Sequence, residues 1–570
     1  MSILNTIQQN NEYDVVICGA GFAGQTLARQ LKLNYPDLSI LIIEKAHFPV
    51  TVAGHKVGES TVDASGYYLS DVLKLHDYLH EKHLLKLGFR FFWDDEPQNG
   101  FSHRPELGLS EYYPFHAYQL DRGVFENDLY FMNLELGIKV IDQASVADIS
   151  IHQGQLHEVQ YKERLTKCTN VVKARWVIDA MGRRSFLQKK FNLRIKSKTS
   201  HSAVWFRVKG RVDVADLVPE GETTWHERVP NRMRYYSTNH LMGHGYWIWL
   251  IPLSSGYTSV GIVTSEKFHS FSEYNTHQRA MNWLAEHDPI LYNFVQEYEI
   301  VDFLKVRNYT SFTSQIFSSQ RWGCVGNAAT FSDPFYSPGA VVIAYENSLV
   351  SEMIGLDIKN ELTKERVSFF NDFALSVNDN RGRTIQSFYS YLDQSQVMSL
   401  RFLWDVSVAW ALDLPKMLNS IYLDLQQESG LSEIVSQCDS LAQRVDALFL
   451  EWSVKAKGTF SFDFIDYRTI PYLVEIHERN TKKYAPSEKI ANYKYSAEKL
   501  EELSQAMFLL MVEDTMPEKL AMFPEPLWLN AWAMSLNPAK WQEDGLFTPH
   551  SKARDLSQMK KQLKTLYIFD

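Results

Sequence analysis

Cysteine is scarce in this chain of 570 residues. The four that occur, Cys18, Cys168, Cys324 and Cys438, lie far apart, and two of them fall in predicted core strands. This spacing excludes a disulfide framework and a cysteine-based metal cluster. It is typical of a protein of the reducing cytoplasm, which is the location we predict.

Long apolar runs and clusters of basic residues are also missing. No apolar stretch approaches the roughly 20 residues that cross a bilayer, so we expect no membrane span. The first eleven residues are polar and uncharged, which is unlike a signal peptide. The net charge is -10, which argues against nucleic acid or an anionic membrane as the main partner.

The composition is that of a globular protein, with 45% hydrophobic and 22% charged residues and neither repeats nor low-complexity segments. At this length two or three domains are expected. His76, His80 and His83 share one face of a predicted helix around residues 70–85. They lack an acidic or cysteine partner, so we interpret them as a solvated helix face and predict no metal site.

A dinucleotide-binding fingerprint stands at the N-terminus. The apolar run Asp14–Cys18 predicts a buried parallel strand, which leads into Gly19-Ala20-Gly21-Phe22-Ala23-Gly24 and a helix pattern. A second apolar strand, Ser39–Ile43, ends in Glu44. In such a unit the glycines allow a tight turn, backbone approach to a pyrophosphate and close packing of the helix, while the acid accepts hydrogen bonds from a ribose. The sequence therefore predicts a Rossmann-type nucleotide site.

Two further strand-to-turn motifs favour FAD over NAD as the cofactor. Asp179-Ala180-Met181-Gly182 resembles the Asp-x-x-Gly motif of FAD-dependent monooxygenases. Gly326-Asn327-Ala328 resembles their second ribityl motif, with Asn327 in the place of an Asp. Asparagine still accepts a hydrogen bond but carries no charge. We predict one FAD, held without a covalent bond.

The predicted fold is α/β, with a discontinuous FAD-binding domain over residues 1–380. Alternating strands in residues of about 90–120 and 200–305 predict an inserted antiparallel sheet on the substrate side; Ser202–Val208, for example, has the pattern of a half-buried strand. Apolar residues at helical spacing predict a helical C-terminal domain over residues 381–570.

The run Trp247-Ile248-Trp249-Leu250-Ile251-Pro252 matches the Trp-x-Trp-x-Ile-Pro signature of the flavin-dependent halogenases. Val57-Gly58-Glu59-Ser60 is similar to a segment that lies near the flavin in that family, and Asp333–Gly339 to its active-site loop. Phe402-Leu403-Trp404-Asp405 resembles the longer members, of the pyrrolnitrin-pathway type. On these motifs the chain is similar to the flavin-dependent halogenases over most of its length.

The resemblance implies an enzyme that uses reduced FAD, delivered by a separate flavin reductase, and oxygen to oxidise a halide. A lysine then holds the oxidised halogen beside an apolar or aromatic substrate, which is either free or bound to a carrier protein. Cofactor contacts are expected from Gly19, Gly21, Phe22, Ala23, Gly24, Glu44, Lys45, Gly58, Glu59, Ser60, Arg122, Asp179, Gly182, Gly326, Asn327, Asp333, Pro334, Gly339 and Ala340. Trp247, Trp249, Tyr336 and Ser337 are expected to form the wall of the substrate site.

The chain departs from the family pattern at two places. The position expected for the catalytic lysine holds Phe92 or Trp93, with Lys86 and Arg90 nearby but out of register. Lys86 is the candidate for the catalytic residue; the alternative is a solvated lysine at a helix end. Pro338 takes the place of a residue whose amide binds halide, and proline has no N–H to donate. Tyr336 also replaces a glutamate of the tryptophan halogenases.

Three hypotheses follow from this sequence. The first is a halogenase of a divergent subgroup, which uses Lys86 or another group. The second is a flavin monooxygenase or dehydrogenase that kept the scaffold and does not use halide. The third is a flavin-binding protein without catalysis. The substrate itself cannot be named from the sequence.

Overall fold

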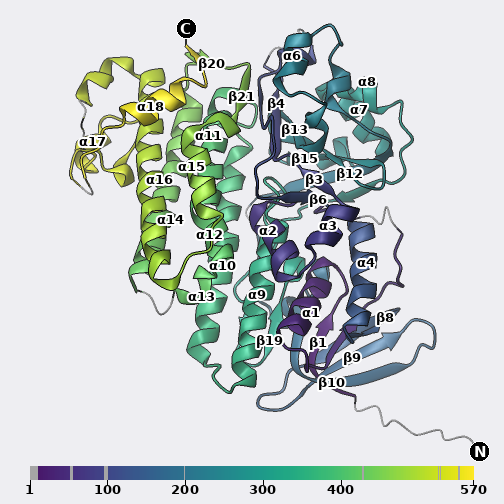
Figure 1. Cartoon of the computed structure of the whole chain (residues 1–570). Coiled ribbons are helices and arrows are strands. Elements are labelled where there is room, and N and C mark those ends of the chain that lie inside the picture. The colour runs from purple at the N-terminus through teal and green to yellow at the C-terminus, as the bar shows by residue number, and fades with distance from the viewer. Residues whose placement is uncertain are drawn as a thin grey trace, which may run out of the picture.

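The computed structural model describes residues 11–51, 56–95, 100–197, 199–425, 429–523, 526, 528–549 and 552–569. Two mixed sheets lie one above the other, and the helices of the C-terminal third stand together along one side of both (Figure 1). This arrangement brings a helical layer against the edge where the two sheets meet.

The first sheet is built around β1 (Glu12–Cys18), which pairs in parallel with β2 (Ile40–Ile43) on one side and β10 (Thr169–Asp179) on the other. Its strand order is β18-β19-β10-β1-β2-β7, with β9 paired to β10 and β8 paired to β9. Val15–Cys18 are completely buried because both neighbours and the flanking helices cover them. Gly24 lets α1 (Phe22–Asn34) pack closely on the strand, since a Cβ there would lie 2.0 Å from the Gly19 carbonyl oxygen. The predicted Rossmann-type fold is confirmed.

The second sheet has the order β16-β12-β15-β14-β13-β4-β5-β21. Its central strands are buried on both faces, so the prediction of half-buried strands was wrong for β12 (His201–Lys209), in which only Lys209 is exposed. Alternate residues of β12 and β14 (Tyr246–Pro252) belong to two separate hydrophobic clusters, one on each side of the sheet. The helices α7 (His277–His287) and α8 (Pro289–Val295) cover the outer face.

The helical layer contains α10 (Lys364–Phe388), α11 (Ser395–Val408), α14 (Ser429–Lys455) and α16 (Pro486–Thr515). Helix α10 runs without a break through residue 380, where the sequence predicted a domain boundary, and β21 of the C-terminal part pairs with β5. The division into domains therefore stays a prediction.

The other strands are β3 (Leu84–Lys86), β4 (Phe89–Trp93), β5 (Glu106–Gly108), β6 (Ala117–Gln119), β7 (Lys139–Ile141), β8 (Ala144–Ser150), β9 (His157–Glu163), β11 (Arg194–Ile195), β13 (Thr238–Gly243), β15 (Tyr257–Ser265), β16 (Leu304–Val306), β17 (Phe312–Thr313), β18 (Phe317–Ser318), β19 (Trp322–Cys324), β20 (Phe460–Ser461), β21 (Phe464–Asp466) and β22 (Ile568–Phe569). The other α-helices are α2 (Asp63–Tyr67), α3 (His76–Lys82), α4 (Arg122–Glu135), α5 (Phe186–Lys190), α6 (Thr223–Arg228), α9 (Gly339–Ile358), α12 (Leu414–Leu418), α13 (Ile421–Asp424), α15 (Pro471–Asn480), α17 (Lys540–Glu543) and α18 (Ser557–Lys564). Among the described helices, none is both long and apolar enough to span a bilayer.

Candidate active site

The three glycine motifs meet at the carboxyl ends of β1, β10 and β19. A Cβ on Gly19 would lie 2.4 Å from the Ala180 carbonyl oxygen, and Gly19 has a φ of +112° that suits glycine. A Cβ on Gly326 would lie 2.9 Å from the Ala23 side chain. The motifs predicted to bind one cofactor therefore border one site, as expected at this edge of an open α/β sheet.

The backbone around this edge fits FAD. No heavy atom of the described chain lies within 4 Å of a Cβ built on Gly21, Gly182 or Gly339, so each of these glycines faces open space. Helices α1 and α9 begin beside Gly21 and Gly339, and no side chain caps either helix. The N–H groups of the first turn of α1 are therefore available to a pyrophosphate.

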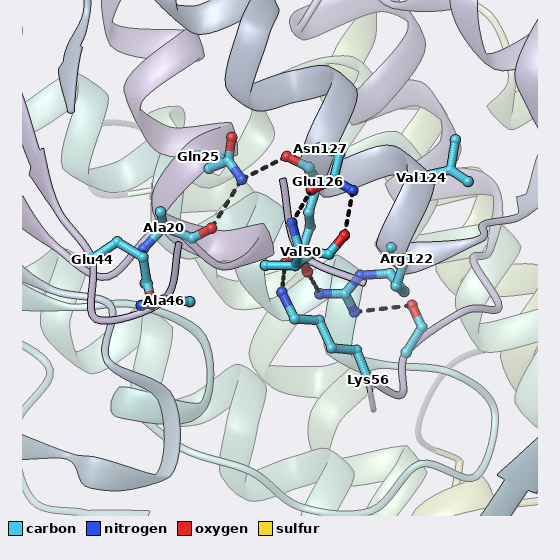
Figure 2. Close-up of polar contacts among 12 residues, drawn as sticks. Ala20, Gln25, Glu44, Ala46, Val50, Lys56, Arg122, Val124, Glu126 and Asn127 are labelled. Carbon is cyan, nitrogen blue, oxygen red and sulfur yellow. Dashed lines mark hydrogen bonds and ion pairs between the residues drawn. The ribbon is translucent and has the colours of Figure 1, made fainter. Parts of the chain in front are cut away.

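Glu44 lies beside the glycine-rich turn. Its carboxylate accepts hydrogen bonds from the amide of Ala20, at 2.7 Å, and from the amide of Ala46, at 2.8 Å (Figure 2). These bonds hold the carboxylate at the end of β2, where a ribose of FAD would be bound. Lys45, also predicted to contact the cofactor, is exposed.

Arg122 brings the start of α4 to the start of α1. Its guanidinium lies 4.7 Å from the centre of the Phe22 ring and donates to the Val57 carbonyl at 2.7 Å. The buried carboxylate of Glu126 binds both Arg122 and Lys56 (Figure 2). The predicted residues Phe22, Gly58 and Arg122 are thus neighbours, with a cation close to the helix start that would hold phosphate.

Glu59 and Ser60 connect this cofactor site to the second sheet. The Glu59 carboxylate pairs with Arg207 at 2.9 Å, and burial raises the pKa of Glu59. The Ser60 hydroxyl lies 2.8 Å from the Thr238 hydroxyl and accepts a hydrogen bond from Lys86, also at 2.8 Å.

The Asp333 loop is fixed by two tyrosines that sequence reasoning missed. The buried Asp333 carboxylate accepts hydrogen bonds from the hydroxyls of Tyr309, at 2.6 Å, and Tyr389, at 2.9 Å. Burial raises the pKa of Asp333. The Trp247 indole donates to the Tyr389 hydroxyl at 3.1 Å. The tryptophan signature and the loop are therefore joined through one buried tyrosine.

A cavity of about 560 Å³ lies between this loop, α2, β3 and the helical layer. Of the residues predicted to form the substrate wall, Tyr336 lines it, whereas Trp247, Trp249 and Ser337 are not among its lining residues. Phe335, which does line the cavity, packs against Trp247 with 5.2 Å between ring centres. The two indoles lie 5.7 Å apart. Their position between flavin and substrate stays a prediction.

Lys86 is a buried residue of this cavity. It is the last residue of β3, is only 4% exposed and lines the cavity wall. Its amine donates to the Ser60 hydroxyl and to the Thr61 carbonyl, both at 2.8 Å, and lies 3.6 Å from the centre of the Phe89 ring. Burial lowers the pKa of Lys86 well below its usual value, and Asp63 opposes this only in part. The alternative of a solvated lysine at a helix end was wrong, because the chain forms a strand here that pairs with β6.

The residues in the expected register of the family lysine lie elsewhere. Phe92 packs against Phe101 in the outer hydrophobic cluster, and the Trp93 indole donates to the Leu392 carbonyl at 3.0 Å. The guanidinium of Arg90 is bound by Glu106 and by the Leu109 carbonyl. Neither of the two aromatic residues nor Arg90 lines the cavity, whereas Lys86 does.

Sequence reasoning also missed a charged pair on α11. Arg401 and Asp405 both line the cavity and bind each other at 2.7 Å. They are the only charged residues of this mostly buried helix and are spaced four residues apart. This was a signal that could have found them, because burying a charged pair costs free energy.

Comparison with known proteins places these observations in a family. A sequence model of the tryptophan halogenase family matches residues 101–397, about half of the chain. The chain is similar to the flavin-dependent halogenase chlA of Dictyostelium discoideum, with 29% identity over 72% of each protein. It is also similar to the 1H-pyrrole-2-carbonyl-[peptidyl-carrier protein] chlorinase of Pseudomonas fluorescens, with 25% identity over 62% of this chain and 77% of the relative.

Among solved structures, the halogenase PltM in complex with phloroglucinol and FAD has the same fold. The TM-score is 0.61 at 18% identity, over 84% of this chain and 98% of that one. The chain belongs to the tryptophan halogenase family and is a flavin-dependent, FAD-binding oxidoreductase of the halogenase type.

Proposed function

We propose that this protein halogenates a neutral aromatic compound in the 560 Å³ cavity, with Lys86 as the catalytic residue. The observation that carries the proposal is the buried amine of Lys86, which ends at the cavity wall between the cofactor segment and the aromatic side chains. A separate flavin reductase would supply the reduced FAD. When bound, reduced FAD would activate oxygen, which is the oxidant that converts halide into hypohalous acid.

The environment of Lys86 suits transfer of an oxidised halogen. Burial lowers the pKa of Lys86 and so favours the neutral amine, whose lone pair is the group that reacts with an oxidised halogen. Hypohalous acid would exchange its hydroxyl for this amine, so that a nitrogen–halogen bond forms and water leaves. The aromatic carbon then takes the halogen, and the ring proton returns to the nitrogen. Ser60 and Thr61 hold the amine in place through both steps.

The lining of the cavity supports a neutral substrate. Aromatic and aliphatic side chains form most of the wall, which favours an apolar ring. Five carboxylates line it against three basic side chains, and the lowered pKa of Lys86 weakens one of the three. An anionic substrate would therefore meet a net repulsion. One named relative acts on carrier-bound pyrrole, and a halogenase of the same fold binds phloroglucinol. The proposed substrate is therefore either free or bound to a carrier protein.

Replacing Lys86 by alanine tests the proposal. We expect Lys86→Ala to lose halogenated product at least about 100-fold, as for other removed catalytic groups, while oxygen consumption by the reduced holoenzyme stays at the wild-type rate. The matched control is Lys82→Ala, which removes an exposed lysine from α3. Unchanged product in Lys86→Ala would contradict the proposed role.

A second candidate function is a halide-independent monooxygenase. It is favoured by Pro338, which stands directly before α9 and has no N–H to offer a halide. An oxygenated product formed equally with and without bromide would support this alternative.

A further inference from the structure

The charged pair on α11 lies in the wall of the cavity. The Nε of Arg401 donates to both carboxylate oxygens of Asp405, at 3.0 and 2.9 Å, and its Nη2 donates to one of them at 2.7 Å. Nη2 also pairs with Asp446 at 2.6 Å. One guanidinium is therefore shared by two carboxylates inside the protein.

Arg401 has one donor to spare. Its side chain is 1% exposed, and its guanidinium lies 4.8 Å from the Phe388 ring centre and 5.2 Å from that of Phe449. The Nη1 atom is buried and has no hydrogen-bond partner within the described part of the chain. Buried donors without an acceptor are rare because desolvation costs them free energy. Nη1 itself has almost no accessible surface, so a ligand in the cavity meets this charged pair at Asp405, whose side chain is 15% exposed.

The charges around Arg401 restrict what this ligand can be. Asp405 and Asp446 together exceed the positive charge of Arg401, so a third anion would be repelled. A neutral hydroxyl group fits, because it can donate a hydrogen bond to the Asp405 carboxylate, which Arg401 holds in place. Asp405 is 15% exposed where it lines the cavity, and burial raises the pKa of Asp405 to about 6, so it is mostly ionised at neutral pH.

Aromatic side chains connect this polar end to Lys86. The Phe89 ring lies beneath the Lys86 amine and 5.8 Å from the Tyr336 ring, and Tyr336 lies 5.9 Å from Phe402 on α11. All of them line the same cavity. A flat ring held between these side chains could therefore have its hydroxyl at α11 and its carbon edge toward Lys86.

Resting on the function proposed above, we propose that Asp405, held in place by Arg401, accepts a hydrogen bond from the neutral hydroxyl of a phenolic substrate and so determines the specificity of the enzyme. A hydroxyl that donates to a carboxylate also feeds electron density into its ring. The bond that selects the substrate thus favours attack of the ring carbon on an electrophilic halogen.

Three probes of one ring size test the proposal: phloroglucinol, its trimethyl ether 1,3,5-trimethoxybenzene, and 3,5-dihydroxybenzoate. Binding to the FAD-loaded protein is measured by calorimetry, without turnover. Wild type should bind phloroglucinol about tenfold or more tightly than the ether, as expected for a hydrogen bond to a charged group. The carboxylate-bearing probe should also bind more weakly than phloroglucinol.

The variant Asp405→Asn should reduce the preference for phloroglucinol over the ether to within about threefold, since an amide is a weaker acceptor than a carboxylate. Asp288→Asn is the matched control, because Asp288 is also a buried carboxylate paired with an arginine, Arg104, and it does not line the cavity. This control should keep the wild-type preference.

Equal binding of phloroglucinol and its ether by wild type would overturn the proposal, whether or not Asp405→Asn folds. So would failure of every probe to bind, or a folded Asp405→Asn that keeps the preference. Bound phenol that is never halogenated would instead contradict the proposed function, and halogenation without any preference for a hydroxyl would contradict only this inference.

Discussion

The amine of Lys86 is buried, and burial lowers its pKa. Among the described residues, Asp63 is the carboxylate that opposes this decrease. Because the pKa is lower in the folded state, protonation of Lys86 favours the unfolded chain. At a pH below the folded-state pKa, each unit of this decrease reduces the free energy of unfolding by about 1.4 kcal/mol. A lysine at this position therefore lowers the stability of the fold, as strained catalytic groups commonly do.

We expect Lys86→Met to raise the free energy of unfolding at pH 7 by about 1–2 kcal/mol, because it removes the cost of an ionisable buried group. The gain should shrink as the pH approaches the usual lysine value of 10.5, where the unfolded lysine also loses its proton. Urea unfolding at both pH values measures this difference. A variant that is less stable than wild type at pH 7 would show that the hydrogen bonds to Ser60 and Thr61 outweigh the desolvation.

The site of Lys86 could not be located from the sequence alone. The histidine spacing before it predicts a helix to residue 85, but α3 ends at Lys82 and β3 follows. What decides this is pairing with β6, where Lys86 lies opposite Ala117. Such a long-range contact leaves no periodic signal in the local sequence.

At the scale of single elements, the start of α1 is where the sequence was most informative. Turn, helix and strand are all specified by nearby residues, and the open space beside Gly21 agrees with a close approach by the pyrophosphate of FAD. The sequence of β14 was less informative, because apolar residues cover both faces of this strand and leave no alternation of apolar and polar positions. Its tryptophans were recognised by the signature motif and not by a regular spacing of apolar residues.

We expect Gly21→Val to fold normally and to lose most of its FAD. The space beside Gly21 accepts a side chain in the protein alone, with φ at -77°, but that side chain would occupy the place of the pyrophosphate. The measurement is the ratio of flavin to protein absorbance, with circular dichroism to check folding. Gly221→Val, an exposed glycine that also faces open space, is the control. Full FAD occupancy in Gly21→Val would contradict the placement of the cofactor.

At the scale of the whole molecule, the helical layer packs along one side of both sheets (Figure 1). Side chains of this layer, of β4 and of the Asp333 loop together line the cavity. Sequence patterns predicted the FAD site and the helical region separately. They could not predict Arg401 and Asp405 at the cavity wall, because the packing of α11 against the Asp333 loop depends on contacts between distant segments. The cofactor residues were thus predictable, and the substrate residues largely were not.

The described part of the fold contains one nucleotide-binding sheet, already used by the FAD motifs. We therefore expect NADPH alone to reduce the bound flavin far more slowly than turnover requires, and an added flavin reductase to restore activity. Stopped-flow bleaching of the flavin absorbance measures both rates. Rapid bleaching by NADPH without a reductase would contradict the need for a partner enzyme.

The most direct test of halogenation is the product formed by the wild-type holoenzyme with reductase, oxygen and phloroglucinol, analysed by mass spectrometry with and without bromide. We expect a product with the bromine isotope pattern that appears only when bromide is present and is missing in Lys86→Ala. An oxygenated product that forms to the same extent without halide would contradict it.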